Sequence, residues 1–391
     1  MRVAIIQQHV DLERGGAETS TVEMARHLAQ LDVDVTVICR SQSLATFVDQ
    51  GVTFVPIVAQ GLTRALQTYR FVQGAGRVCR RGGYDIVHAV TPCLFANVYQ
   101  PRGGTYAETV ERTLALVRDP TWRELKRLGR RFNISQRFLY RIEQTLLGKY
   151  RQRVFVAAVS EYVRQQVVEG LRFPAERVRV VFNGIDVQPL DDEERALQRA
   201  SMRRALGLAD EAPLALFVAH NFKLKGLAEL IRALAIDIAG DGPAWTLAVA
   251  GRDEPRTYAR LARRLGLAAR VRFVGTNTPV QAWYAAADVL AHPTWYDPCS
   301  RVVLEALSVG LPVVTTRYNG AAEVMESGRH GEVIAEPADA TELAAALQRA
   351  ARPAVRVACR ADAARMCEQL SMARHARELL SFYRYVLAAQ R

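Results

Sequence analysis

Apolar runs of strand length alternate with helical patterns twice along this 391-residue chain. In the first half the runs include residues 34–40 and 84–90, and the alternation restarts at 214–220 after a polar stretch. Strands separated by helices form a parallel sheet with helices on its faces, and a chain of this length usually holds more than one core. We therefore predict an α/β protein of two Rossmann-like domains with an interdomain cleft.

The boundary between the domains is marked by Asn183-Gly184 and by the polar run DDEERALQRA at 191–200. Turn and charged residues of this kind are typical of connections between cores. We predict an N-terminal domain at 1–185 with a basic amphipathic insert at about 107–153, a C-terminal domain at 186–370, and a final helix at 371–391 that packs back on the N-terminal domain.

Composition excludes several classes of protein. No apolar run reaches the roughly 20 residues that a membrane-spanning helix needs, and the start, MRVAIIQQHV, is too short and too quickly polar for a signal peptide. The six cysteines are scattered with no CxxC pair, which argues against a zinc site and a disulfide framework. We expect reduced thiols and a cytoplasmic protein.

The net charge of +12 is concentrated in one segment. Residues 112–153 hold twelve Lys or Arg against three Asp or Glu, interleaved with apolar and aromatic residues such as Trp122 and Leu125. A basic amphipathic stretch suits an anionic membrane surface. A nucleic-acid partner and a solvated helical hairpin are the alternatives. We expect a peripheral protein on the inner face of the cytoplasmic membrane and no nucleic-acid partner.

The segment HPTWYDPCSRVVLEALSVGLPVV, residues 292–314, contains two acids eight residues apart, Asp297 and Glu305. Glu305 falls in an apolar helical pattern that stops at Gly310, and a buried strand follows. This order places both carboxylates at the C-terminal edge of a parallel sheet, where α/β proteins bind ligands. Carboxylates accept hydrogen bonds from sugar hydroxyls, and the free amides of a helix N-terminus favour phosphate. A nucleotide-sugar fits this chemistry.

Candidate cations and amides flank the acids. Lys225 precedes a glycine at a strand-to-helix turn, Lys223 lies two residues earlier, and Arg252 follows another strand. Cations there can stabilise negative charge that develops on a leaving diphosphate. At the start of the predicted helix, the amides of Cys299, Ser300 and Arg301 could bind the distal phosphate. Ordinary helix capping by Ser300 is the alternative.

The chain resembles the retaining glycosyltransferases of family 4, whose two Rossmann-like domains form the GT-B arrangement. Within that group it is similar to the lipopolysaccharide core glucosyltransferases. The resemblance covers nearly the whole chain and is densest in the second half. It is carried by GGAE (15–18), NGID (183–186), KG (225–226), AGRD (250–253), VRFVG (271–275), YAAADVLAHPTWYDPCSRVVLEALSVGLPVVTT (284–316) and NGAAEVMESGRHGEVI (319–334).

The resemblance implies roles for the candidate residues. Asp297 would contact the hydroxyls of the donor sugar and Glu305 those of the ribose, although the family usually has Glu at both positions. The family pairs its lysine with an arginine five residues earlier, where this chain has His220, so the second cation would be Lys223, Arg252 or protonated His220. The loop with Gly15 and Gly16 would approach the donor phosphate, because glycine lets backbone come close to a ligand.

The first domain offers acceptor-side candidates in His88, Arg102, Gly103 and Gly104. By our alignment, the carboxylate of similar proteins falls on Gly103, and no protein base stands out. That fits a retaining reaction in which the leaving phosphate oxygen takes the acceptor proton. Asp32-x-Asp34 mimics a metal-binding motif, but strand alternation explains Asp34 as an outward residue. We expect no metal and no other cofactor, because lysines and helix amides can carry the diphosphate charge.

The expected activity is transfer of a hexose, most simply glucose from UDP-glucose, to a lipid-linked or lipopolysaccharide-core saccharide. Two enzymes on the same plan are alternatives: a nucleotide-sugar epimerase, which needs an acid/base set, and a phosphorylase, which needs a pyridoxal lysine. A non-catalytic membrane or nucleic-acid adaptor is the alternative from another class.

Overall fold

The computed structural model divides the chain into two compact units. Unit 1 comprises Met1–Asp186 and Ser371–Arg391, and unit 2 comprises Val187–Leu370. The structure describes residues 1–10, 16–40, 51–117, 119–129, 134–187, 190–239 and 244–390. The chain thus passes from one unit to the other after Asp186, one residue from the boundary predicted from the sequence, and returns at Ser371.

Unit 1 is built on a parallel sheet whose described strands number seven, in the order β3-β2-β1-β4-β5-β6-β7. The apolar runs seen in the sequence form its central strands, which are buried almost throughout. The strands are β1 (Arg2–Ile6), β2 (Asp34–Arg40), β3 (Val52–Ile57), β4 (Ile86–Ala89), β5 (Val98–Tyr99), β6 (Phe155–Ala158) and β7 (Val178–Val180). The helices are α1 (Gly16–Ala29), α2 (Arg64–Gly82), α3 (Tyr106–Ala115), α4 (Pro120–Gly129), α5 (Ile134–Leu147), α6 (Glu161–Gln165) and α15 (Met372–Ala389).

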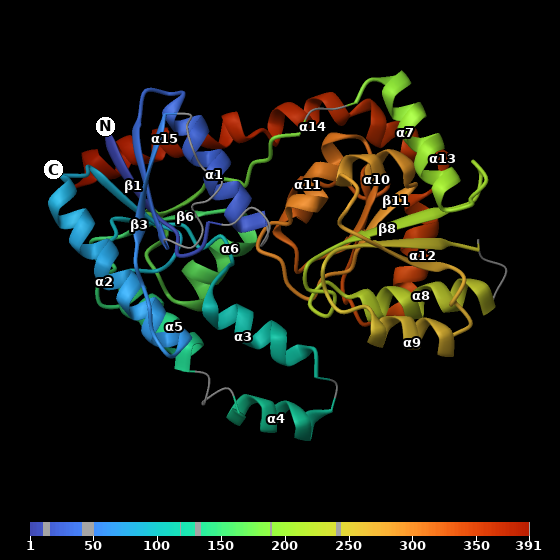
Figure 1. The fold of residues 1–391 in the computed structure, drawn as a ribbon, viewed down its shortest axis with the longest axis horizontal. Coiled ribbons are helices and arrows are strands. Elements are labelled where there is room, and N and C mark those ends of the chain that lie inside the picture. Colours follow the sequence, from blue (N-terminus) through green and yellow to red (C-terminus); the bar gives the residue numbers. More distant parts are fainter. Residues whose placement is uncertain are drawn as a thin grey trace. The chain divides into compact units, whose positions relative to one another are not determined.

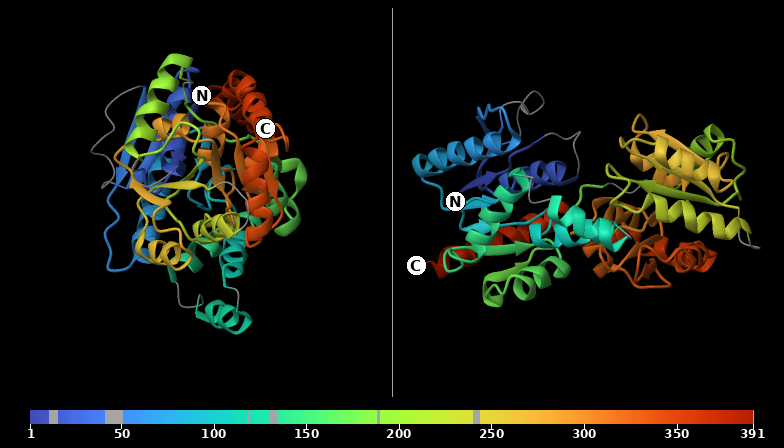
Figure 2. Two further views of the ribbon diagram at one scale, coloured as in Figure 1. Left: turned by 90° about the vertical axis from the view of Figure 1, so that its right-hand side faces the viewer. Right: turned by 90° about the horizontal axis from the view of Figure 1, so that it is seen from below.

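The last helix of the chain, α15, belongs to the core of unit 1. It packs against α1, and Figures 1 and 2 show it (red) beside the blue strands of this unit. Its residues at helical spacing, Met372, Ala376, Leu379, Tyr383 and Val386, are buried in one cluster with β1 and β2. Burial of such side chains contributes roughly 1.5–3 kcal/mol each, so unit 1 depends on the C-terminal end of the chain.

The basic insert forms three helices, α3, α4 and α5, rather than a hairpin of two. α3 contacts both other helices, while α4 stands away from the rest of unit 1 in Figures 1 and 2. Glu143 of α5 is fully buried and ties the insert to the sheet: it accepts a hydrogen bond from Tyr99 Oη at 2.7 Å and from the Tyr106 amide at 2.8 Å. Burial raises the pKa of Glu143 to about 7.

Unit 2 repeats the plan with a parallel sheet of six described strands, in the order β10-β9-β8-β11-β12-β13. The strands are β8 (Leu214–Val218), β9 (Thr246–Ala250), β10 (Val271–Gly275), β11 (Val289–His292), β12 (Val313–Thr316) and β13 (Gly331–Ile334). The helices are α7 (Asp192–Ala205), α8 (Leu227–Ala239), α9 (Arg256–Arg264), α10 (Val280–Ala286), α11 (Arg301–Ser308), α12 (Ala340–Ala350), α13 (Pro353–Ala361) and α14 (Ala363–Gln369).

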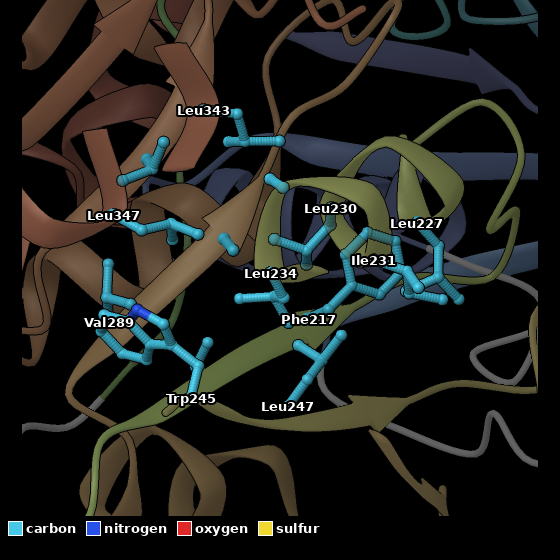
Figure 3. Close-up of a cluster of buried hydrophobic side chains, with 14 of the residues drawn as sticks. Phe217, Leu227, Leu230, Ile231, Leu234, Trp245, Leu247, Val289, Leu343 and Leu347 are labelled. Carbon is cyan, nitrogen blue, oxygen red and sulfur yellow. The ribbon is translucent and has the colours of Figure 1, made fainter. Parts of the chain in front are cut away.

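The core of unit 2 lies between its sheet and helix α8. Leu227, Leu230, Ile231 and Leu234 recur every three or four residues and form one face of α8, and they pack with Phe217 and other strand residues in a single buried cluster (Figure 3). This packing fixes where α8 begins. It therefore fixes the loop at 219–226, which joins β8 to α8 and carries Lys225.

Two further findings concern membrane-spanning helices and cysteines among the described residues. None of the helices there is both long and apolar enough to cross a bilayer. All six cysteines lie in the described part of the chain and are free thiols.

Candidate functional site

The strand order of unit 2 creates a topological switch point between β8 and β11. From β8 the chain proceeds to β9 on one side, and from β11 it proceeds to β12 on the other. The loops that follow such neighbouring strands diverge, and ligands bind in the crevice outside their carboxyl ends. Lys225 lies in the loop after β8, and Asp297 lies in the loop after β11.

Lys225 and Asp297 meet at this switch point. Lys225 Nζ is 2.6 Å from Asp297 Oδ2 and donates to the Tyr296 carbonyl at 3.0 Å. Both side chains are largely shielded from solvent. The two residues predicted to contact the sugar and the diphosphate therefore belong to one ion pair, although 71 residues separate them along the chain.

The carboxylate of Asp297 is held in place from several sides. Its Oδ1 accepts the Cys299 amide at 3.2 Å, and its Oδ2 lies 3.6 Å from Nε2 of the buried His292. Burial alone would raise the pKa of Asp297, but the charge of Lys225 and the contact with His292 outweigh it and hold the pKa well below its usual value. Asp297 is thus an ionised acceptor at neutral pH.

Glu305 has its own support on α11. Tyr284 Oη donates to Oε2 of Glu305 at 2.9 Å, and Arg301 Nη2 lies 3.3 Å from its Oε1. Burial, and then the charge of Glu305, raise the pKa of Tyr284 well above its usual value, so the tyrosine remains a hydrogen-bond donor. These two partners fix the orientation of the carboxylate, which is the requirement for recognising a ligand's hydroxyl groups.

Two glycines allow the loops at this edge to approach one another. Gly226 has a φ of +82°, and a Cβ on it would lie 2.1 Å from the Pro293 carbonyl oxygen. Gly251, which follows β9, has a φ of +148°, and a Cβ there would lie 1.8 Å from the Ala219 oxygen. A real side chain does not tolerate such distances, so glycine is needed in both motifs, KG and AGRD.

The amides at the start of α11 were predicted to bind a phosphate, with helix capping by the Ser300 side chain as the alternative. Ser300 is the N-cap residue, but its side chain makes no capping hydrogen bond; instead Ser300 Oγ lies 3.3 Å from His292 Nε2. The Ser300 amide donates to Asn319 Oδ1 at 3.1 Å, and the Cys299 amide is held by Asp297. In this structure the amides of Cys299 and Ser300 therefore donate to side chains of the protein.

The other donor-side cations lie nearby on exposed loops. Lys223 and Arg252 are exposed after β8 and β9, and the Phe222 amide donates to Asp253 Oδ2 at 2.8 Å, which joins the two loops. Burial, and then the charge of Arg252, lower the pKa of His220. His220 is therefore neutral at pH 7, which leaves Lys223 and Arg252 as candidates for the second cation.

In unit 1 the structure does not fit the acceptor-side roles expected for His88 and Arg102, because both are buried inside the unit. Nδ1 of His88 lies 2.5 Å from Tyr383 Oη, and the Arg102 guanidinium contacts Gln100 and His375. Burial, and then the charge of Arg102, lower the pKa of His88 to about 3. Both side chains hold α15 to the sheet instead of facing a ligand.

The glycines of unit 1 are placed as follows. Gly16 begins α1, and Gly15 lies outside the described residues. Gly103 is exposed with no atom within 4 Å of a Cβ placed on it, and Gly104 is buried with a φ of +75°. Asp34 is exposed and pairs with Arg2 at 3.3 Å, as its outward position in the strand predicted.

Three residues of the site were assigned no role from the sequence: Tyr284, His292 and Asn319. Each acts on a predicted residue from another element, so spacing along the chain does not reveal it. His292 ends a strand directly before the acidic segment, and this position was the available signal.

In the described part of the chain, no group of three or more His, Cys, Asp or Glu residues is arranged to hold a metal ion.

Two family models match the chain, one in each half. The model for Glycosyltransferase Family 4 matches residues 14–189, and the model for Glycosyl transferases group 1 matches residues 212–352. The second match contains Lys225, Asp297 and Glu305.

Individual proteins agree with the models. The lipopolysaccharide glucosyltransferase WaaG of Escherichia coli K12 is 34% identical over 175 residues, which cover 45% of this chain and 47% of that protein. A crystal structure of WaaG has a TM-score of 0.77 at 22% identity and covers 97% of this chain and 99% of that chain. The structure of Anabaena HepE in complex with UDP-glucose has a TM-score of 0.70 at 19% identity and covers 98% of this chain and 99% of that chain. The chain therefore belongs to the GT-B glycosyltransferases, with a family 4 domain followed by a group 1 domain.

Proposed function

We propose that this glycosyltransferase moves glucose from UDP-glucose, with retention of configuration, to a lipid-linked or lipopolysaccharide-core saccharide. The observation that carries the proposal is the Lys225–Asp297 ion pair at the switch point of unit 2, with the Glu305 carboxylate fixed on α11, the helix that follows Asp297. Fixed carboxylates beside a shielded cation suit a ligand that is rich in hydroxyls at its ends and anionic in the middle.

In this proposal the acids recognise the two sugars. Glu305, oriented by Tyr284 and Arg301, accepts hydrogen bonds from the ribose hydroxyls. Asp297, kept ionised by Lys225, accepts those of the transferred sugar. Hydrogen bonds to a charged acceptor are worth roughly 1.5–3 kcal/mol each, so the two acids supply much of the donor affinity.

The diphosphate lies between these acids in the proposal. Lys225, with Lys223 and Arg252 on neighbouring loops, offsets its charge. Because the Cys299 and Ser300 amides are already engaged, the helix contribution in this proposal comes from the following amides of the first turn of α11, beginning with Arg301, since the first N–H groups of a helix have no acceptor within it. No metal or other cofactor is invoked for this role.

We propose that the acceptor hydroxyl attacks on the face from which the diphosphate leaves. The bond from the anomeric carbon to the phosphate oxygen breaks, the bond to the acceptor oxygen forms, and the acceptor proton passes to the departing phosphate oxygen. Lys225 offsets the negative charge that develops on the phosphate oxygen as the bond breaks and before the proton arrives. Exposed Gly103 and its neighbour Gly104 remain our proposed acceptor-side residues.

The relatives support the choice of donor and acceptor. Anabaena HepE has been crystallised with UDP-glucose, and WaaG is named as a lipopolysaccharide glucosyltransferase. This chain spans 47% of the WaaG sequence in the matched segment, so the acceptor in particular is our proposal. Asp297, one methylene shorter than the usual Glu, places the carboxylate further from the sugar, and this length is a specificity feature of the proposed site.

The test of this function is the Glu305→Gln variant. It keeps the size of the side chain but removes the ionised acceptor, so UDP should bind about 10- to 100-fold more weakly, measured by calorimetric titration. Glu368→Ala, which removes an exposed acid on α14, should bind UDP as the unmodified protein does. Equal UDP affinity in Glu305→Gln would remove Glu305 from the donor site.

The reaction itself is followed by UDP release from UDP-glucose with and without a lipopolysaccharide-core acceptor. Acceptor-dependent release with an α-linked product supports retention. Conversion of UDP-glucose to another UDP-sugar without UDP release would instead identify an epimerase, and binding without either reaction would identify a non-catalytic adaptor.

We further propose that α4 attaches the protein to the inner face of the cytoplasmic membrane. Trp122 and Leu125, three residues apart on one helix face, are 63% and 55% exposed. Arg123, Lys126 and Arg127 alternate with them on the same short helix. Aromatic and aliphatic side chains flanked by cations bind the interface of an anionic bilayer.

The membrane proposal predicts that Trp122→Ala/Leu125→Ala lowers binding to phosphatidylglycerol-rich vesicles about tenfold or more, because two apolar side chains no longer enter the interface. Co-sedimentation measures the effect, and binding should also weaken with salt. Leu197→Ala, which removes a leucine that is 65% exposed on α7, should leave binding unchanged. Undiminished binding of the double variant would show that α4 is not the membrane contact.

A further inference from the structure

Arginines from two helices gather at the amino edge of the unit 2 sheet, the edge opposite Lys225 and Asp297. On each helix they recur every four residues, so they lie on one face. Figure 1 shows these helices, α7 and α13, at the same end of the unit. The arginines are Arg195, Arg199 and Arg203 of α7 and Arg356 and Arg360 of α13.

The acids in this cluster do not balance its cations. Asp288, directly before β11, is shared by three arginines: Arg199 Nη2 at 2.8 Å, Arg356 Nη2 at 3.2 Å and Arg203 Nη1 at 3.5 Å. Arg360 pairs with the Asp192 carboxylate, which is 91% exposed and contributes little. With Asp210, whose charge acts on Arg203, three carboxylates face five guanidinium groups.

The excess charge lines a pocket of about 280 Å³. Arg195, Arg199, Arg356 and Arg360 line it, with Asp288 and Pro312 among the residues of its wall. Arg199 and Arg203 are engaged by backbone carbonyls, including that of Ala286, so they hold α7 against the sheet. Arg195, Arg356 and Arg360 are the cations with capacity left for a ligand.

Arg195 has hydrogen-bonding capacity that the described residues do not use. One of its terminal nitrogens donates to the carbonyl of Val309 at the end of α11, while its buried Nε has no hydrogen-bond partner among the described residues. Burial, followed by the like charge of Arg360, lowers the pKa of Arg195 to about 10. A partly buried guanidinium that is repelled by its neighbour is stabilised when an anion enters.

We propose that this pocket binds a small phosphate-bearing anion. Arginine forks match phosphate oxygens in a bidentate geometry, and two helices here present such forks to one space. The volume is at the lower end for ligand pockets, which suits inorganic phosphate or a phosphorylated monosaccharide. β11 separates this pocket from the proposed donor site by four residues, roughly 13 Å, so the two sites can be occupied together.

The experiment titrates the full chain with inorganic phosphate, glucose 6-phosphate and, as a sulfonate control of equal ionic strength, methanesulfonate. The phosphate compounds should raise the thermal unfolding temperature saturably. In Arg195→Gln/Arg360→Gln the affinity should fall about tenfold or more, because charge-assisted hydrogen bonds are lost. The stronger of the two phosphate ligands distinguishes a free phosphate from a phosphorylated sugar.

Two controls separate this site from others. Arg260→Gln/Arg263→Gln removes the same charge from α9, where both arginines lie on another surface, and should retain binding. Glu305→Gln, which alters the proposed donor site, should also retain phosphate binding, so the two proposals can fail independently of each other. Loss of binding in either control, full binding in Arg195→Gln/Arg360→Gln, or no saturable response to either phosphate compound would overturn the proposal. Arg195→Lys, which keeps the charge but not the fork, should bind with intermediate affinity.

Discussion

Lys225→Met is expected to lower kcat for transfer by a factor on the order of 10²–10³, because a preorganised cation facing a leaving anion contributes that much in comparable sites. The same change should reduce the stability of unit 2. It leaves the largely buried Asp297 carboxylate without its cation at 2.6 Å, and removal of one partner of a buried pair costs roughly 3–5 kcal/mol. Product formation and urea unfolding measure the two effects.

The double variant Lys225→Met/Asp297→Asn separates these effects. It removes both charges, so it should regain most of the stability but none of the activity. Recovery of transfer in the double variant would show that Lys225 serves only to neutralise Asp297, and the proposed role of its charge at the diphosphate would be wrong.

The stability difference should also depend on pH. In the unmodified protein the pKa of Asp297 lies below its unfolded value of 3.8, so its contribution is complete above that pH and is lost only in stronger acid. In Lys225→Met, burial is unopposed by the lysine and the folded pKa rises. As the pH falls from 7 toward 4, protonation of Asp297 removes the unpaired buried charge from the variant. The difference in unfolding free energy between the two proteins should therefore narrow over that interval. A difference in unfolding free energy that stays constant between pH 7 and 4 would mean that the unpaired Asp297 carboxylate is not the cause of the lost stability.

The second large effect is expected from Gly226→Ala. A methyl group at this position would approach the Pro293 carbonyl oxygen to 2.1 Å in a backbone with a φ of +82°. The loop must move or the two strands must separate, and we expect destabilisation of roughly 4 kcal/mol or more with loss of donor binding, because Lys225 is the preceding residue. Urea unfolding and UDP titration provide the measurements.

Gly266→Ala is the matched control. Its φ of +73° is close to that of Gly226, but no atom lies within 4 Å of the added Cβ. This variant should lose only the cost of a left-handed alanine, about 1 kcal/mol. Equal losses in the two variants would contradict the close approach of the loops that follow β8 and β11.

The sequence predicted the sheets well because buried parallel strands leave continuous apolar runs. Residues 34–40 and 214–218 illustrate this, since both are strands of the structure within the predicted runs. The prediction that Asp297, Glu305 and Lys225 belong to one donor site rested on motifs. In the structure all three residues lie in unit 2. β5 left little signal because it has two residues. The third helix of the insert, α4, begins at a signal that the sequence does contain, since Asp119 accepts a hydrogen bond from the Trp122 amide at 2.9 Å.

The parts that could not be predicted arise from contacts between distant segments. Arg102 was an acceptor-side candidate from the sequence. Its burial depends on His375 and Asn183, which come from the other end of unit 1. Similarly, the amide of Ser300 is taken by Asn319 from the loop after β12. Spacing identifies residues on one helix or loop, but partners of this kind are set by the order of strands in the sheet.

The course of the chain through α15 bears on how the protein is made. Unit 2 is one continuous stretch, whereas unit 1 needs residues from both ends of the chain. During synthesis, unit 2 has therefore left the ribosome in full before the N-terminal unit obtains its last helix, which reverses the usual N-to-C order of domain completion. Until then the apolar surface that α15 will cover on α1 and the first strands is exposed. A released chain that ends near residue 370 would have a complete second unit attached to a first unit that is prone to aggregate.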